Sequence, residues 1–202
     1  MEDIFAFAVA IGLSAACGFR VFIPPMILSG TALFGETDLP SRLLWLEDPF
    51  VFGVLAIAVF VEIAGYYIPW VDNALDALAG PASVVAGTLI NRAYIGGGDE
   101  FLYWVLAAIV GGGSAGSMQM LTTVTRLTSS ATTGGLGNPV VSTTENAGAA
   151  LMSILALAVP IIAAVSVIAL IAFAVKRFIQ FMNNRRQQSA AGSSSSGTPP
   201  RP

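Results

Sequence analysis

The sequence contains no histidine and a single cysteine. Without histidine, the chain lacks the commonest general base and the commonest metal ligand of proteins. Cys17 alone cannot form a disulfide within the chain, and we interpret it as a small packing residue because no imidazole is available to activate it. We therefore expect no enzymatic activity, no catalytic residues, no bound metal and no cofactor.

Charge is also scarce. Charged residues make up 10% of the chain and hydrophobic residues 55%, whereas a soluble domain carries about 25% charged residues. No charge falls within residues 101–125 or 146–175, and each stretch exceeds the roughly 20 residues that cross a hydrocarbon core. Because backbone groups in lipid must bond within their own segment, we predict an all-α, multi-span transmembrane bundle.

Four firm spans are predicted, over residues 4–34, 49–70, 101–127 and 146–175. Arg20 and two prolines interrupt the first, and Pro160 is expected to kink the last. Gly80 and Pro81 are expected to end a short helix that Asp72 caps, so that residues 81–95 form a fifth, thin span or a re-entrant half-helix.

Two further helix starts are predicted from capping residues. Asp99 is expected to cap the helix that begins near residue 101. Ser142 and Glu145 have the spacing of a capping box, which predicts that the last helix begins near residue 146.

The transmembrane domain is expected to cover residues 1–187, followed by a disordered tail rich in Ser, Gly and Pro over residues 188–202. Basic residues from Lys176 to Arg186 follow the last apolar run, which predicts a cytoplasmic C-terminus. The chain has no basic patch typical of a nucleic-acid-binding face, so nucleic acid is not an expected partner.

Four ionisable residues lie within or close to the apolar runs: Arg20, Glu62, Arg126 and Glu145. A charge inside the membrane costs roughly 2.5–3.5 kcal/mol on insertion scales, so such side chains normally face the protein interior and pair. Arg20 with Glu62, and Arg126 with Glu145, are the candidate pairs. A gate, a relay or a polar substrate site is one interpretation of this candidate intramembrane polar site. The alternative is a structural ion pair, or snorkelling of the side chain to a membrane interface.

A polar stretch between the last two apolar runs is a candidate re-entrant or loop element, which contains Thr132, Thr133, Gly134, Gly135, Gly137 and Asn138. Glycines and hydroxyls in succession can present backbone amides to an anion. A phosphate-binding P-loop would end in Gly-Lys-Ser/Thr, and no lysine is present here. The alternative is a tight loop that joins two spans.

Small residues recur at spacings of about four, a pattern that lets helix backbones approach closely in lipid. The candidate helix-packing residues are Gly12, Gly18, Gly112 and Gly116.

Three stretches carry a family resemblance: IGLSAACGFR at residues 11–20, YYIPWVDN at 66–73 and ATTGGLGNP at 131–139. Together they resemble a bacterial membrane-protein family, the domain-of-unknown-function 4126 family, over about residues 4–177. The resemblance implies a small multi-pass protein of the bacterial inner membrane. It supplies no activity, substrate or catalytic residue.

The buried charges and the glycine-rich segments favour a small-solute or ion transporter or channel. The alternative is a non-catalytic membrane scaffold or assembly factor. The expected partners are the lipid bilayer and a small solute or ion that the sequence does not identify, and assembly into a homo-oligomer stays open.

Overall fold

The computed structural model of this chain describes residues 2–35, 37–97, 99–173, 175–176 and 180. Over those residues the chain is helical, and none of them belongs to a strand. The chain divides into two compact units, Met1–Val167 and Ile168–Pro202, and the site described below lies wholly in the first. The domain boundary at residue 187 and the disordered tail predicted above fall outside the described residues.

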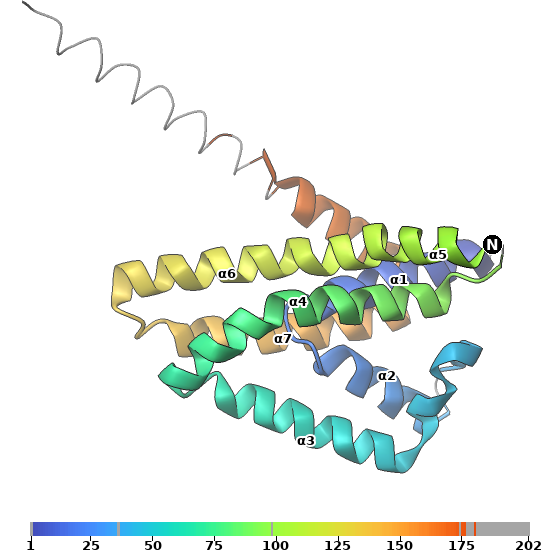
Figure 1. The fold of residues 1–202 in the computed structure, drawn as a ribbon, viewed down its shortest axis with the longest axis horizontal. Helices are drawn as coiled ribbons and strands as arrows, with labels where there is room; N and C mark the ends of the chain where they lie inside the picture. The colour runs from blue at the N-terminus through green and yellow to red at the C-terminus, as the bar shows by residue number, and fades with distance from the viewer. Residues whose placement is uncertain (1, 36, 98, 174, 177–179, 181–202) are drawn as a thin grey trace, which may run out of the picture. The chain divides into compact units, whose positions relative to one another are not determined.

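The elements up to Ala158 follow one another in this order (Figure 1): α1 (Glu2–Cys17), α2 (Ile23–Leu33), the 3-10 helix η1 (Ser41–Glu47), α3 (Pro49–Gly65), α4 (Pro69–Tyr94), α5 (Glu100–Ala107), the π-helix η2 (Ala108–Gly112), α6 (Gly113–Thr133) and α7 (Asn138–Ala158). A further apolar helix covers Pro160–Phe173. The helix is therefore interrupted directly before Pro160, where a kink was predicted.

Helix α1 is the centre of the unit and packs against α4, α6 and α7. Its second half is buried on every side, including Leu13, Ser14 and Cys17, each with 0% exposure. Small side chains make this possible, because a Cβ at Gly12 would lie only 2.6 Å from Ala156 Cβ on α7. The Ser14 hydroxyl donates to the Gly87 carbonyl oxygen on α4 at 2.8 Å. Cys17 therefore lies in the packed core, as its interpretation as a packing residue requires.

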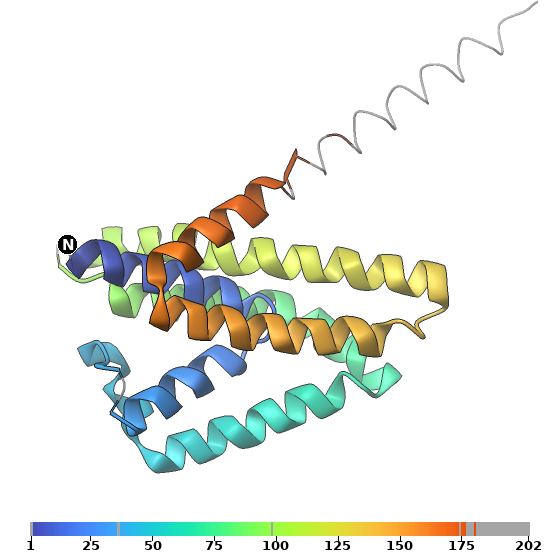
Figure 2. The same ribbon diagram turned by 180° about the vertical axis from the view of Figure 1, so that it is seen from behind.

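The first apolar run is two helices rather than one span. Helix α1 has 16 residues and α2 has 11, and Figures 1 and 2 show α2 turning back toward the end of the bundle at which α1 begins. Residues 18–22 form the turn, and Pro24 and Pro25 stand in the first turn of α2, where missing N–H groups cost little. The prediction of a firm span over residues 4–34 is thus wrong.

Helix α4 corrects two predictions. It begins at Pro69, after Ile68, so Asp72 lies inside the first turn and does not cap the helix. It also continues through Gly80 and Pro81 to Tyr94, so residues 81–95 are not a separate thin span or half-helix. Packing of α4 along α1 and α6 outweighs the hydrogen bond that Pro81 removes.

The longest helical stretch combines α5, η2 and α6 and runs over Glu100–Thr133, 34 residues. The prediction that Asp99 caps it is confirmed, since Asp99 Oδ1 accepts from the Leu102 amide at 3.0 Å. Helix α7 then begins at Asn138, so Ser142 and Glu145 lie within it and form no capping box. Pro139 in the first turn provides the start signal that the sequence interpretation missed.

The outward surfaces fit a helical membrane protein. Among the residues that the structure describes, three helical segments are long and apolar enough to cross a membrane: Ala74–Tyr94 of α4, Glu100–Thr133 and Asn138–Ala158. A fourth span results if η1 and α3, which meet at 79°, count as one. Large apolar side chains such as Phe60, Phe101 and Leu151 are 71%, 78% and 68% exposed, while small residues fill the interior. Such a distribution suits contact with lipid rather than water.

Candidate functional site

Arg20 enters the bundle from the turn between α1 and α2, and only 2% of it is exposed. Gly18 allows this turn to approach α6 closely, because a Cβ at residue 18 would lie 2.6 Å from Met118 Cβ. Arg20 Nε donates to Asn146 Oδ1 at 2.5 Å, and Nη2 donates to the Ser142 carbonyl oxygen at 3.3 Å. Nη2 also lies 3.1 Å from Glu145 Oε2, so the Arg20 side chain ties the turn to α7.

Glu62 lies near the end of α3 and is 7% exposed. Its two carboxylate oxygens accept from the backbone amides of Val21 and Phe22, at 2.9 Å and 3.2 Å. These amides precede α2, so Glu62 satisfies donors at a helix start that has no side-chain cap of its own. The sequence analysis predicted Glu62 as a candidate ion-pair partner of Arg20. In the structure Arg20 pairs with Glu145, and Glu62 holds the backbone that follows Arg20.

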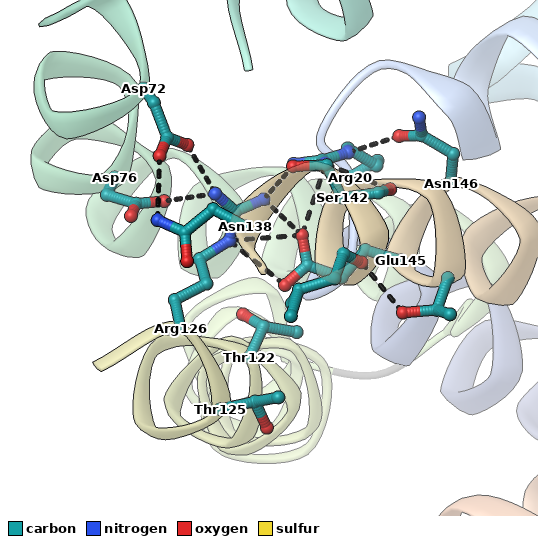
Figure 3. A network of polar contacts seen from close by, with 12 residues as sticks. Arg20, Asp72, Asp76, Thr122, Thr125, Arg126, Asn138, Ser142, Glu145 and Asn146 are labelled. Atoms are coloured by element: carbon teal, nitrogen blue, oxygen red, sulfur yellow. Dashed lines mark hydrogen bonds and ion pairs between the residues drawn. The ribbon is translucent and has the colours of Figure 1, made fainter. Parts of the chain in front are cut away.

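Arg126 and Glu145 form the ion pair that the sequence proposed for them (Figure 3). Arg126 Nε lies 3.1 Å and 3.2 Å from the two Glu145 oxygens, and Arg126 Nη2 also donates to Glu145. Arg126 Nη2 donates to the Ser142 hydroxyl at 2.8 Å as well. Ser142 and Glu145 are three positions apart on α7, so both face the same guanidinium. Arg126 and Glu145 are each 4% exposed.

Two carboxylates on α4 complete the surroundings of Arg126. Asp72, which is 4% exposed, accepts from Arg126 Nη1. Its second carboxylate oxygen accepts from Nδ2 of the Asn138 side chain at 3.3 Å. Asp76 lies one turn further along α4, with Oδ1 3.7 Å from Arg126 Nη1. Four positions separate the two aspartates, which places both on one face of α4. Neither was a predicted site residue, although this spacing after Pro69 was a signal that could have found them.

Tyr66, which is 4% exposed, joins the two arginines through its ring. The ring centroid lies 3.7 Å from Arg20 Cζ and 4.3 Å from Arg126 Cζ, so both guanidiniums make cation–π contacts with it. Burial raises the pKa of the Tyr66 hydroxyl to about 12, which keeps the phenol neutral at physiological pH. Tyr66 was not among the predicted site residues.

These ionisable side chains form what we call the charge cluster: Arg20, Glu62, Asp72, Asp76, Arg126 and Glu145. They come from five segments of the chain: the turn after α1 and helices α3, α4, α6 and α7. All four ionisable residues predicted from sequence belong to it. In the described part of the chain, no group of three or more His, Cys, Asp or Glu side chains is placed to hold a metal ion.

The family model for a domain of unknown function (DUF4126) matches residues 7–179, most of the chain. The chain belongs to the DUF4126 family. The whole charge cluster lies within the matched residues of this DUF4126 protein, and the resemblance carried by the three sequence stretches is confirmed. No curated protein and no solved structure matches the chain.

The glycine- and threonine-rich segment of this DUF4126 protein is mostly helix and a short turn. Thr132 and Thr133 end α6, and four residues, 134–137, join it to α7. Gly134 and Gly135 have positive φ values of 64° and 90°, which glycine adopts without strain. The Gly137 amide donates to Thr133 Oγ1 at 2.9 Å. Of the predicted residues in this segment, Asn138 reaches the charge cluster, through the hydrogen bond of its side-chain amide to Asp72.

The four predicted packing glycines lie at close approaches between elements. A Cβ at Gly112 would meet Thr88 Oγ1 at 2.7 Å, and one at Gly116 would meet Val84 Cγ2 at 3.2 Å, both on α4. Gly12 faces α7 and Gly18 faces α6, as described above. Gly111, in η2, approaches the backbone of Gly87 even more closely. These contacts hold α4 and α6 at the spacing that lets Asp72 and Arg126 meet.

Proposed function

We propose that this protein is a transporter or channel for a small polar solute or ion, with the charge cluster as its polar centre. One observation carries the proposal. Charges are scarce in this chain, yet six ionisable side chains from five segments converge inside the helix bundle. Ionisable groups among membrane helices are costly and typically mark solute pathways or relays.

A structural role alone explains the cluster less well. A buried ion pair recovers its desolvation cost only with good geometry, and apolar residues of similar volume are often as stabilising. The segments that supply the cluster also include the turn between two short helices, α1 and α2. Helices interrupted inside the bundle are typical of solute sites in transporters, because their ends present polar backbone groups to the site.

The proposal predicts flux that depends on the geometry of Arg126. Purified protein in liposomes should carry at least one member of a panel of radiolabelled small polar solutes and monovalent ions. Arg126→Lys keeps the positive charge but replaces three nitrogens that make five hydrogen bonds by a single ammonium with three donors, so we expect the flux to fall to the level of protein-free liposomes.

Arg42→Lys is the matched control. The Arg42 side chain is 49% exposed and pairs with Glu100, so the same substitution there should leave the flux unchanged. No flux above protein-free liposomes for any solute, with the wild-type protein folded, would contradict the transport proposal and favour the scaffold alternative.

We also propose that the protein lies in the bacterial inner membrane with its C-terminus in the cytoplasm. The basic residues from Lys176 to Arg186 support this orientation. A green fluorescent protein fused after Arg186 is expected to fluoresce, and alkaline phosphatase fused at the same position is expected to be inactive. Active phosphatase with a dark fluorescent fusion would place the C-terminus in the periplasm and overturn the orientation.

A further inference from the structure

We propose that Asp76 is the group at which the charge cluster takes up and releases a proton. The inference rests on the transport role proposed above and adds the chemical identity of one exchanged species. It follows from three features of Asp76: its exposure, its contact with Arg126 and the charge balance around it.

Asp76 is the accessible carboxylate of the cluster. Its side chain is 26% exposed, whereas those of Asp72 and Glu145 are 5% and 4% exposed. Water or hydronium can therefore reach an Asp76 oxygen without opening the helix bundle. The other two carboxylates that pair with Arg126, those of Asp72 and Glu145, are buried among packed side chains.

Of the three carboxylates that pair with Arg126, Asp76 makes the longest ion-pair contact. Its ion-pair distance is 3.7 Å, which is beyond hydrogen-bond reach. Asp72 accepts from Arg126 and from Asn138, and Glu145 is bound by Arg126 and Arg20. Neutralising Asp76 thus breaks no hydrogen bond to Arg126 and leaves its other contacts in place.

The charge balance leaves Asp76 as the surplus anion. Two arginines face four carboxylates in the cluster. Asp72 and Glu145 bind the arginines directly, and Glu62 is stabilised by two backbone amides at the start of α2. Negative charge near a helix N-terminus is favourable. Among the described side chains, Asp76 has only the 3.7 Å contact with Arg126 as compensation, so protonation there lowers the excess negative charge of the cluster.

Charged and titratable groups from each neighbouring segment interact electrostatically with Asp76. They are Arg126 on α6, Glu145 on α7, Arg20 in the turn after α1, Asp72 on α4 itself and the neutral Tyr66 after α3. The arginines attract the negative charge of Asp76, and the carboxylates repel it. Because attraction and repulsion oppose each other here, a modest movement of Arg126 changes the proton occupancy of Asp76.

A proton fits this place better than a metal cation. A metal ion bound to Asp76 would lie beside the Arg126 guanidinium, which repels it. Calcium and magnesium also require about six or more oxygen ligands, and the described residues offer no such group of side chains. Proton uptake forms an O–H bond on an Asp76 oxygen at the expense of hydronium, which leaves as water. Release reverses the step, with no change of oxidation state.

The test measures proton uptake by liposomes that contain the purified protein and an internal pH dye, under an inside-negative potassium diffusion potential. Wild-type protein is expected to acidify the interior faster than protein-free liposomes. Asp76→Asn, which cannot ionise, should abolish the excess uptake, and Asp76→Glu should restore it. Asp38→Asn, at an exposed aspartate outside the cluster, should retain wild-type uptake. The melting temperature in detergent verifies that each variant is folded.

Solute flux and proton uptake separate the two proposals. Excess proton uptake that survives in folded Asp76→Asn, or its absence from a wild-type protein that carries solute, overturns the role of Asp76 and leaves the transport proposal standing. Wild-type protein that moves neither protons nor any solute overturns both.

Discussion

Replacement of Glu145 by alanine is expected to lower the free energy of unfolding by about 3–5 kcal/mol, the cost of removing one partner of a buried ion pair. Among the described residues, Glu145 is the carboxylate that pairs with both Arg20 and Arg126. Its loss leaves the buried Arg20 guanidinium without its ion-pair partner and removes three hydrogen bonds of Arg126. Equilibrium unfolding of the purified variant in detergent, compared with wild type, measures the change.

Glu47→Ala is the control, because Glu47 is exposed in η1 and its loss should change stability little. A variant at Glu145 that is as stable as the Glu47 variant would show that the buried pair contributes nothing.

Double-mutant cycles discriminate the two possible partners of Arg20. The coupling energy between Arg20 and Glu145, whose atoms lie 3.1 Å apart, should exceed the coupling between Arg20 and Glu62, which binds backbone amides instead. The opposite order would support the pairing suggested by sequence alone.

Replacement of Gly111 by alanine is expected to destabilise the protein by about 1–3 kcal/mol, the usual cost of overpacking a core. The added Cβ would meet the Gly87 carbonyl oxygen and Asn91 Cβ, and would lie 3.0 Å from the Gly87 carbonyl carbon. Backbone atoms cannot move aside as a side chain can, so α4 and η2 must separate. The melting temperature in detergent should fall accordingly.

Gly113→Ala, two positions away, is the matched control. A Cβ at Gly113 meets no atom within 4 Å, and alanine favours helix over glycine by up to about 1 kcal/mol. We expect this variant to melt at or above the wild-type temperature. Equal melting temperatures for the two variants would show that the α4–η2 contact is not tight.

The class of the protein, and the charged residues that are costly to place among membrane helices, could be predicted from the amino-acid sequence. Long stretches without charge leave helices as the only backbone arrangement that satisfies itself in lipid. The same physics singles out Arg20, Glu62, Arg126 and Glu145, since each charge among apolar residues needs a partner. The Asp99 cap was also predictable, because a cap depends on contacts within one turn.

The pairing of these charges, and the residues that join them, depends on how the helices pack in three dimensions. The Arg20 contact with Asn146 spans 126 positions and the Arg126 contact with Asp72 spans 54, distances over which no local pattern acts. Asp72 looked like a helix cap, and Tyr66 was not predicted as a site residue, because their contacts come from α6, from α7 and from the turn after α1. Likewise, α4 continues through Pro81 because packing along its length outweighs one lost hydrogen bond, and the energy of such packing is absent from local sequence.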